Sequence, residues 1–151
     1  MMSLKPAEIL LVEDNPDDAE LTLNSFQKSV LKNKVHHVKD GAEALEFIFA
    51  TGAYSDRDKG LPPRMVLLDL KLPKVSGLEV LRRIRSDERT RYLPVVVLTS
   101  SREDRDLIDT YALGVNSYIV KPVDFAKFTD AITRLGEYWL FLNQVPPDPR
   151  A

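Results

Sequence analysis

The sequence predicts a doubly wound α/β fold in which a five-stranded parallel sheet, in the order 2-1-3-4-5, carries helices on both faces. Three observations lead to this fold class. Short apolar runs alternate five times with longer segments that carry apolar residues at helical spacing. The runs are continuously apolar, which is typical of strands buried on both faces. The 151 residues, 44% of them hydrophobic, suit a single globular domain.

The first strand and helix are joined by an abrupt change from apolar to acidic residues. Residues 8–12, E-I-L-L-V, predict a buried strand that ends at Glu13 and Asp14. Asn15 then suits a helix N-cap, and the proline after it suits the first helical position. We therefore expect a helix over about 16–28.

The second strand and helix are followed by a long connection. Residues 35–38 predict a short strand, and Asp40 with Glu43 forms a capping box that opens a helix. From about 50 to 64 the composition is typical of a loop. We expect a surface excursion there and assign it no chemistry.

The third and fourth strands also end in polar residues. Residues 65–68, M-V-L-L, lead directly to Asp69, and a capping box of Ser76 and Glu79 opens the next helix. Residues 95–98 form the fourth predicted strand, which ends in a run of hydroxyl residues.

Two helices enclose the fifth strand. Ser101 and Asp104 are expected to cap the fourth helix, and Gly114 to close it. Residues 117–120 predict the fifth strand. Apolar residues at helical spacing then predict a long amphipathic last helix that reaches about Leu142.

These elements account for the whole chain. We expect one domain over residues 1–151, with a core of about 7–143, a proline-rich tail at 144–151 and no output domain. No apolar run approaches the roughly 18 residues of a membrane helix, and the first eight residues are too polar for a signal peptide. A cytoplasmic location without membrane association is therefore expected.

The composition excludes several classes of site. The chain has no cysteine, and its two histidines, His36 and His37, are expected to be structural. A net charge of -2 argues against a nucleic-acid surface. Neither of the glycine-rich phosphate-binding motifs, G-x-G-x-x-G or G-x-x-x-x-G-K, occurs.

Four of the five predicted strands end in residues that carry chemistry. Glu13 and Asp14 follow the first strand, Asp69 the third, Thr99 the fourth and Lys121 the fifth. The carboxyl ends of parallel strands meet at one rim of the sheet, where such folds bind ligands. In the order 2-1-3-4-5 the first and third strands are neighbours, so Asp14 and Asp69 should lie together.

This set of residues suits phosphoryl transfer. Neighbouring carboxylates repel one another, and a hard divalent cation such as Mg²⁺ relieves the repulsion. Three carboxylates contribute about -3, Mg²⁺ +2 and Lys121 +1, so the filled site is near neutral. Asp69 can then act as a nucleophile toward phosphorus, with Lys121 and Thr99 as partners for the phosphoryl oxygens.

Each of these residues alone also has a purely structural interpretation. Strand-end acids, threonines and lysines are common, and a second acid such as Glu13 often only tunes the local field. Tyr118, inside the fifth strand, is equally consistent with a core aromatic and with a moving part. Their convergence on one rim is what favours function.

Four segments resemble a known family. They are I-L-L-V-E-D-N at 9–15, L-L-D-L-K-L-P-K-V-S-G at 67–77, V-V-V-L-T-S at 95–100 and Y-I-V-K-P-V at 118–123. In this order, over about 9–142, they resemble the receiver domain of two-component response regulators, of the stand-alone, CheY-like kind with a flavodoxin-like fold.

The resemblance implies a metal site and a phosphoacceptor. Asp69 matches the phosphoacceptor and a ligand of Mg²⁺ or Mn²⁺. Asp14 matches the direct acidic ligand and Glu13 its neighbour, which acts through water. The backbone carbonyl of Lys71 completes the coordination that the protein supplies.

The resemblance also implies a switch. Thr99 matches the switch hydroxyl, Tyr118 the aromatic rotamer switch and Lys121 the phosphate-binding lysine. In this family the bond between the lysine and the following proline is usually cis, so the Lys121–Pro122 bond is expected to be cis.

Some features depart from the common pattern and others narrow the family. Glu13 stands where Asp is commoner in this family. Lys71 stands where an apolar residue is frequent, and this substitution is expected to affect the lifetime of the phosphorylated state. The loop before the third strand, the segment L-D-L-K-L-P and the Tyr138–Leu140 ending resemble stand-alone regulators associated with bacterial phytochromes.

The resemblance thus implies a phosphoprotein rather than an enzyme: a single-domain response regulator that accepts a phosphoryl group on Asp69. The donor is a sensor histidine kinase, a phytochrome by the finer resemblance. The signal passes by contact to a downstream protein target or a phosphotransfer protein. A homodimer through the face made by the fourth helix, fifth strand and fifth helix is expected.

Four other functions stay open. The first is an intermediate phosphorelay or phosphate-sink receiver. A phosphatase of the haloacid dehalogenase kind would need D-x-D, where the sequence has Lys71 at the second acid. A flavodoxin-like FMN carrier would have its phosphate facing Glu13 and Asp14. A structural interaction domain would use none of the rim residues.

Overall fold

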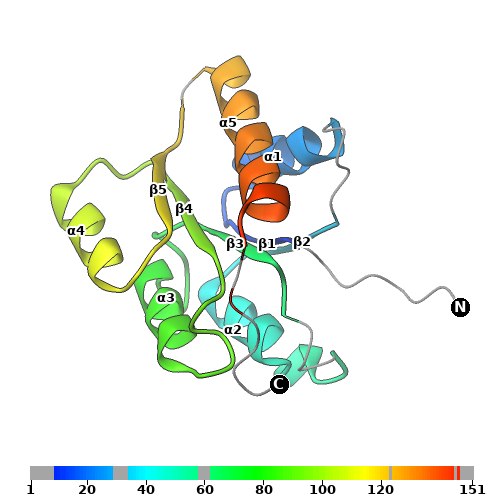
Figure 1. Cartoon of the computed structure of the whole chain (residues 1–151), viewed down its shortest axis with the longest axis vertical. Coiled ribbons are helices and arrows are strands. Elements are labelled where there is room, and N and C mark those ends of the chain that lie inside the picture. The colour runs from blue at the N-terminus through cyan, green and yellow to red at the C-terminus, as the bar shows by residue number, and fades with distance from the viewer. Residues whose placement is uncertain (1–8, 29–33, 58–61, 123, 145, 147–151) are drawn as a thin grey trace, which may run out of the picture.

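The computed structural model describes residues 9–28, 34–57, 62–122, 124–144 and 146 (Figure 1). Its centre is a parallel sheet in the order β2-β1-β3-β4-β5, as predicted. In chain order the strands are β1 (Ile9–Val12), β2 (Val35–Val38), β3 (Met65–Leu68), β4 (Val95–Thr99) and β5 (Ser117–Val120). β2 and β5 are the edge strands, so the three strands whose ends carry acids or Thr99 are interior.

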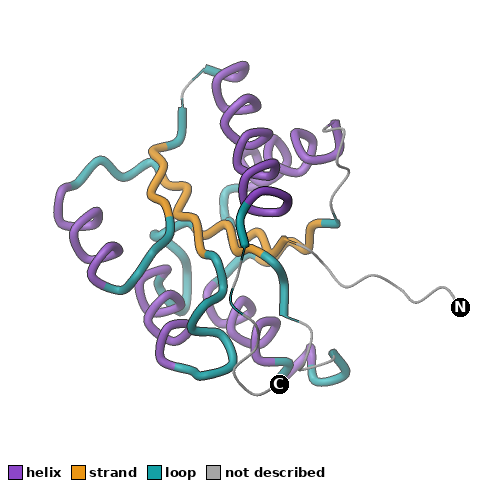
Figure 2. Tube along the Cα trace, in the orientation of Figure 1, coloured by secondary structure: helices purple, strands orange, loops and turns teal. Residues whose placement is uncertain are grey.

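Helices cover both faces of the sheet. α1 (Pro16–Lys28) and α5 (Phe125–Glu137) lie on one face, and α2 (Gly41–Phe49) and α3 (Gly77–Ser86) lie on the other (Figure 1). α4 (Asp104–Ala112) lies beside β5 at the edge. Figure 2 shows the strands as a central layer between the helices. None of the helices in the described parts of the chain has the length and apolarity that a membrane span requires.

The continuous apolar runs arise because both faces of each strand are covered. Successive strand residues point to opposite faces. In β1, Ile9 and Leu11 pack with α1 and α5, whereas Leu10 and Val12 pack with α2 and α3. All four side chains are at most 2% exposed. The sheet thus has two cores and leaves only the strand ends for polar chemistry.

Three predicted N-caps are confirmed. The side chains of Asn15, Asp40 and Ser76 each accept a hydrogen bond from a backbone N–H two or three residues further on. Gly114 follows α4 in a left-handed conformation, φ +84°, which confirms its predicted role in ending that helix. The caps fix where each helix begins relative to the strand end before it.

The predicted capping box of α4 is wrong. Its N-cap is Glu103, whose side chain makes no capping hydrogen bond. Ser101 stays in the loop after β4 because that strand runs one residue further than predicted, to Thr99. The Ser101 hydroxyl instead donates to the carboxylate of Asp106 inside the helix.

The C-terminal helical segment changes its winding. α5 ends at Glu137, and a π-helical turn, η2 (Tyr138–Leu142), completes the length expected for one continuous helix. Leu140 in this turn is buried, whereas Phe141 and Leu142 are exposed. Of the predicted tail, residues 145 and 147–151 lie outside the described residues.

The connection after α2 is partly exposed, as expected, but it is also fastened to the domain. It contains a short 3₁₀ turn, η1 (Gly52–Tyr54). The Tyr54 hydroxyl donates to Glu43 at 2.7 Å and lies 2.9 Å from Nε2 of His36. His36 also stacks on Phe47. The first part of the loop therefore packs against the edge strand β2 through Tyr54 and His36. Residues 58–61 lie outside the described residues.

The start of α3 presses against the backbone that carries Asp69. The Gly77 N–H donates to the carbonyl of Leu70 at 2.9 Å. A Cβ atom on Gly77 would lie 2.3 Å from the carbonyl oxygen of Asp69 and 2.6 Å from Cα of Leu70. Only a glycine permits this approach, because the obstructing atoms are backbone and cannot swing away.

We expect Gly77→Ala to destabilise the protein by about 3 kcal/mol, since the added methyl group forces backbone apart. Gly114→Ala is the matched control. It places alanine in a left-handed conformation, where the methyl group would lie 3.3 Å from Nε of Arg85, an atom of a side chain and not of the backbone. We expect a cost of about 1 kcal/mol. Urea denaturation measures both values. Equal costs for the two variants would contradict the steric explanation.

Candidate functional site

The sheet register places two acids side by side. Val12 of β1 pairs with Leu68 of β3, so the residues that follow them, Glu13 and Asp69, leave the sheet together. The Asp69 N–H donates to the carbonyl of Val12 at 3.1 Å, which continues the ladder by one residue. The Glu13 side chain is 3% exposed and Asp69 is 8% exposed. Burial of two neighbouring carboxylates is unfavourable unless positive charge offsets it.

Lys121 supplies that positive charge from the end of β5. Its Nζ lies 2.7 Å from Glu13 Oε1, 2.8 Å from Asp18 Oδ2 and 3.2 Å from Asp69 Oδ2. Its backbone N–H donates to the carbonyl of Thr99 at 2.8 Å, which keeps the chain aligned with β4. Burial alone would lower the pKa of Lys121. The hydrogen bonds to Asp18 and Glu13 outweigh this, so its pKa is raised and the ammonium stays charged.

Three acids form a group suited to a divalent cation. Carboxylate oxygens of Glu13, Asp14 and Asp69 lie within 4.8 Å of one another. Burial raises the pKa of Glu13 to about 7, despite its contact with Lys121. All-oxygen donors with excess negative charge fit a hard cation such as Mg²⁺ or Mn²⁺ better than zinc. The prediction that Asp14 and Asp69 meet is confirmed.

Thr99 and Tyr118 are linked through the loop after β4. Thr99 is 1% exposed, and its Oγ1 accepts the N–H of Ser101 at 3.3 Å. The Tyr118 hydroxyl donates to the carbonyl of Ser101 at 3.2 Å, while its ring packs against the core. The Ser101 hydroxyl also contacts Asp106 of α4, so Ser101 connects Thr99 to both β5 and α4.

Two further residues of the predicted site stand as follows. Lys71 lies in the loop after Asp69 with its side chain exposed, and the role of its backbone carbonyl as a ligand stays a prediction. The prediction of a cis bond between Lys121 and Pro122 is wrong, because no peptide bond in the described residues is cis. With the trans bond, Lys121 already reaches its three carboxylates.

Sequence reasoning missed two contributors. It read Asp18 as an acid that favours the start of α1, yet Asp18 contacts Lys121. The sequence carries no signal that separates Asp18 from its neighbour Asp17, because the rotation of α1 about its axis decides which acid faces Lys121. The structural role predicted for His37 agrees with its contact, in which Nε2 lies 2.8 Å from the backbone carbonyl of Glu13, but that partner was not foreseen. His37 thus supports the acid cluster through its backbone.

The sequence matches the family described as the response regulator receiver domain over residues 9–133. The probable methanogenesis regulatory protein FilR2 of Methanothrix harundinacea is 43% identical over 141 residues, which span 93% of this chain and 88% of that protein. Response regulator Rcp1 of Synechocystis sp. is 34% identical over 141 residues, which span 93% of this chain and 94% of that protein.

Solved structures agree with these relatives. The Mn²⁺-bound form of response regulator Rcp1 superposes with a TM-score of 0.85 and 33% identity, over 93% of this chain and 99% of that chain. The bacteriophytochrome response regulator AtBRR is 54% identical, with a TM-score of 0.71, over 90% of this chain and 96% of that chain. Sequence and fold therefore point to the same family.

The acid cluster predicts stabilisation by divalent cations. At about 10 mM Mg²⁺ we expect the free energy of unfolding to rise by about 1 to 2 kcal/mol, because the cation binds the folded state. Asp14→Asn should abolish most of this gain and, by relieving repulsion, should stabilise the protein in the presence of EDTA. Thermal denaturation with and without Mg²⁺ measures both effects.

Asp17→Asn is the control for this experiment. Asp17 is exposed in the first turn of α1 and does not belong to the acid group, and its substitution removes the same charge. An Asp14→Asn protein that responds to Mg²⁺ as strongly as Asp17→Asn would show that the cluster is not the binding site.

Proposed function

The chain belongs to the response regulator receiver domain family, and on that premise we propose that Asp69 accepts a phosphoryl group from a phosphohistidine of a sensor kinase. The observation that carries the assignment is the position of Asp69. Its carboxylate lies 3.2 Å from the Lys121 ammonium and within the acid group that suits a divalent cation. Asp69 is the phosphoacceptor candidate because it contacts the ammonium and also belongs to the acid group.

The transfer forms one bond and breaks another. A carboxylate oxygen of Asp69 attacks phosphorus, and the P–N bond to the donor imidazole breaks with its electron pair left on nitrogen, which takes a proton. Lys121 donates to a phosphoryl oxygen and neutralises part of its charge. The Thr99 hydroxyl donates to another oxygen from the end of the neighbouring strand.

A divalent cation, Mg²⁺ in the cell, supplies the positive charge against which an anionic phosphoryl group can approach a carboxylate. We assign its direct side-chain ligands to Asp14 and Asp69, with Glu13 acting through water and the carbonyl of Lys71 completing the set. Within the chain, three carboxylates contact the single ammonium of Lys121, and Asp14 adds a fourth acid close to Glu13 and Asp69. The donor set supports this assignment because it consists of oxygen atoms alone.

Phosphorylation would then act through Thr99. The phosphoryl group adds roughly -1.5 to -2 of charge and three acceptor oxygens. A Thr99 hydroxyl drawn to one of these oxygens leaves the N–H of Ser101 without its present acceptor. Ser101 holds the Tyr118 hydroxyl through its carbonyl and Asp106 through its side chain, so the change reaches β5 and α4.

The partner that supplies the phosphoryl group is a sensor histidine kinase, and we propose that it is a phytochrome. The similarity to bacteriophytochrome response regulators supports this choice. The reaction consumes one phosphoryl group per Asp69, so the protein acts as a phosphoacceptor rather than as an enzyme on a separate substrate. A cytoplasmic place of action follows from the kinase, which uses cytoplasmic ATP. The output is a downstream protein target or a phosphotransfer protein.

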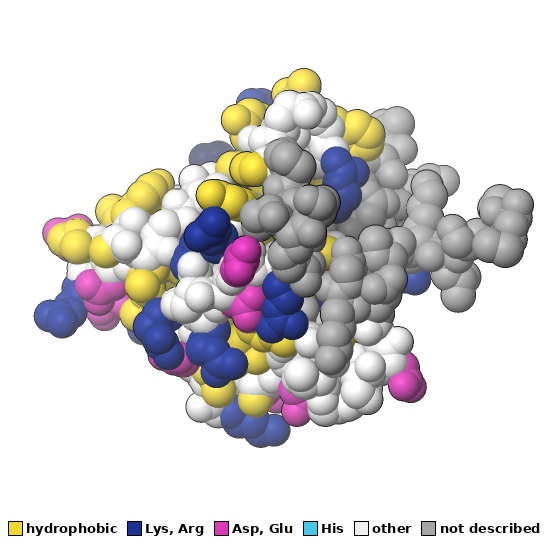
Figure 3. Space-filling model, turned by 60° about the horizontal axis from the view of Figure 1, so that its bottom comes forward, with side chains coloured by type: hydrophobic (Ala, Val, Ile, Leu, Met, Phe, Trp, Pro, Cys, Tyr) yellow, Lys and Arg dark blue, Asp and Glu magenta, His cyan; other side chains and the backbone are white. Residues whose placement is uncertain are grey.

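A homodimer through the α4, β5 and α5 face is the second part of the proposal. Exposed large apolar side chains lie on α4, on α5 and on the turn that follows α5, and Figure 3 shows apolar patches at the left, over α4, and towards the top of the view. They are Leu107, Ile108 and Tyr111 of α4, Phe125 of α5, and Tyr138, Phe141 and Leu142 of η2. β5 is only half-buried. A groove of about 550 Å³ between β5 and α5 is lined by Ile119, Leu135 and Trp139 among others. Apolar exposure of this extent suits a protein partner.

We expect Asp69→Asn to abolish labelling by a ³²P-phosphorylated sensor kinase or by acetyl phosphate with Mg²⁺, because the amide cannot act as the nucleophile. Lys121→Met should slow labelling at least about 100-fold, since a buried charged donor to the phosphoryl group is lost. Asp124→Asn, which only caps α5, is the control and should label normally. An Asp69→Asn protein that still takes up label would overturn the assignment.

For the dimer, we expect Ile108→Lys to weaken self-association at least about 10-fold, because it places an unpaired charge in an apolar interface. Gln27→Lys adds the same charge on α1, away from this face, and should leave the dimer intact. Sedimentation velocity over a range of concentrations measures both. Unchanged association of Ile108→Lys would remove this face as the interface.

A further inference from the structure

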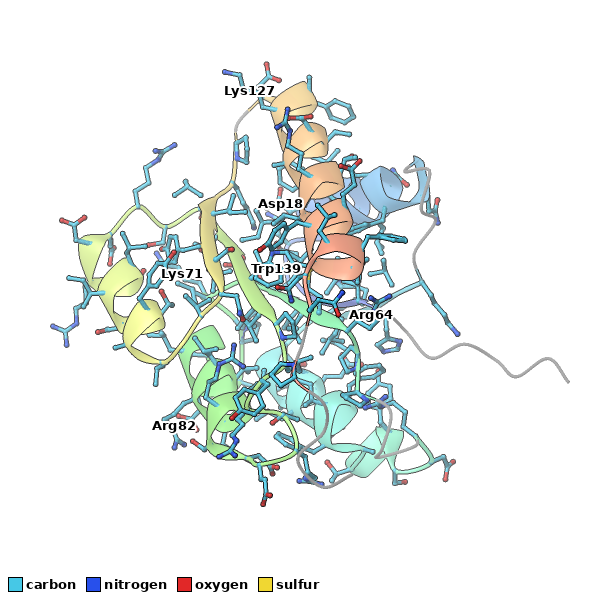
Figure 4. All side chains as sticks on the ribbon, in the orientation of Figure 1. Asp18, Arg64, Lys71, Arg82, Lys127 and Trp139 are labelled. Carbon is cyan, nitrogen blue, oxygen red and sulfur yellow. The ribbon has the colours of Figure 1, made fainter. Side chains whose placement is uncertain are left out.

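Lys121 contacts one carboxylate that the proposed cation site does not explain. Asp18 lies in the first turn of α1, where its backbone N–H donates to the Asn15 cap at 3.0 Å (labelled in Figure 4). Its side chain is 32% exposed, and Oδ2 lies 2.8 Å from Nζ of Lys121. That distance is shorter than the 3.2 Å between Nζ and Asp69. The contact is therefore one of the two tightest that the lysine makes.

Asp18 is held firmly in this place. The Thr22 hydroxyl donates to its backbone carbonyl at 2.8 Å. Ala19, the next residue, is 3% exposed and packs in the core between the sheet and α5. The cap at one side and the core at the other fix the helical turn, so the carboxylate approaches Lys121 from an element outside the sheet.

Asp18 also differs from the other acids in its position. The acid group that suits a cation, among the described residues, consists of Glu13, Asp14 and Asp69. Of the three carboxylates around Lys121, Glu13 and Asp69 belong to this group, and Asp18 does not. A bound cation would therefore compete with Lys121 for Glu13 and Asp69, but not for Asp18.

The hydrogen-bond partners of the Lys121 ammonium must change when Asp69 is phosphorylated. An ammonium has three N–H donors, and each now has one carboxylate partner. A phosphoryl oxygen on Asp69 needs at least one of them, and the cation withdraws the oxygens of Glu13 and Asp69. Asp18 is the acceptor that remains available throughout.

We propose that Asp18 is the positioning residue of Lys121: it anchors the ammonium beside Asp69 while the other two donors pass from carboxylates to the phosphoryl group. This inference rests on the proposed phosphoacceptor function of Asp69. Without Asp18, Lys121 pairs more fully with Glu13 and Asp69. It then hinders cation binding and is less well placed for the incoming phosphoryl group.

Three variants of α1 test the proposal. Asp18→Ala removes the anchor, and Asp18→Asn keeps an oxygen acceptor without the charge. Asp17→Ala is the matched control. Asp17 lies in the same turn and also donates its N–H to Asn15, but it is not among the three carboxylates that contact Lys121. Any general effect of a negative charge at the start of α1 should appear in both positions.

The first measurement is the rate of phosphorylation by acetyl phosphate with Mg²⁺. The second is Mn²⁺ affinity without any phosphodonor, from the electron paramagnetic resonance signal of free Mn²⁺. Loss of a charge-assisted hydrogen bond predicts that Asp18→Ala is about 10-fold slower and binds Mn²⁺ about 5-fold more weakly, with Asp18→Asn between it and wild type. Asp17→Ala should stay within about twofold of wild type on both measurements.

A variant that lacks Lys121 distinguishes positioning of the Lys121 ammonium from a purely structural role of Asp18. In Lys121→Met, Asp18→Ala should change Mn²⁺ affinity no more than Asp17→Ala does, because there is no ammonium left to position. An Asp18→Ala effect that persists in that background, or that equals the Asp17→Ala effect in the wild-type background, overturns the inference. Absence of labelling of the wild-type protein by acetyl phosphate would instead overturn the proposed function, which the inference needs.

Discussion

The site depends on a conflict between sheet geometry and electrostatics. Neighbouring parallel strands β1 and β3, paired Val12 to Leu68, both continue into a carboxylate that is almost fully buried. Isolated charges at such depth would cost several kcal/mol each. The offsetting charge comes from Lys121 at the end of β5, two strands beyond β3. The strand order thus decides whether the acids meet each other and whether the lysine can reach them.

The surrounding contacts prevent the acids from relieving their repulsion by moving apart. His37 holds the carbonyl of Glu13, and Gly77 lies against the carbonyl of Asp69. The backbone of Lys121 is tied to that of Thr99. Each of these contacts is made to backbone atoms, so none of them occupies a side-chain oxygen of the acids. The single ammonium of Lys121 offsets only part of the charge on these acids. A cation from outside the chain would offset the rest, which is why the acid group suits one.

Sequence reasoning reached the fold and the convergent acids because both follow from strand order. A continuous apolar run that ends in Asp69 predicts a buried strand with a carboxylate at the rim. It could not distinguish Asp18 from Asp17, because the rotation of one helix about its axis decides which acid turns inward. Nor could it place Ser101, since an extra residue in β4 moved that hydroxyl from a helix cap to a loop. The isomer of the Lys121–Pro122 bond likewise depends on tertiary contacts.

The packing also explains why a change at Thr99 should leave the domain through α4. Among the described residues, α1, α2, α3 and α5 all contribute side chains to the two core clusters, whereas α4 contributes none. The one buried side chain of α4 is Thr110. A shift of α4 therefore breaks little apolar contact, whereas a shift of any other helix would open a core. Ser101 ties this weakly held helix to Thr99 through two hydrogen bonds, so the least costly movement is also the one connected to Thr99.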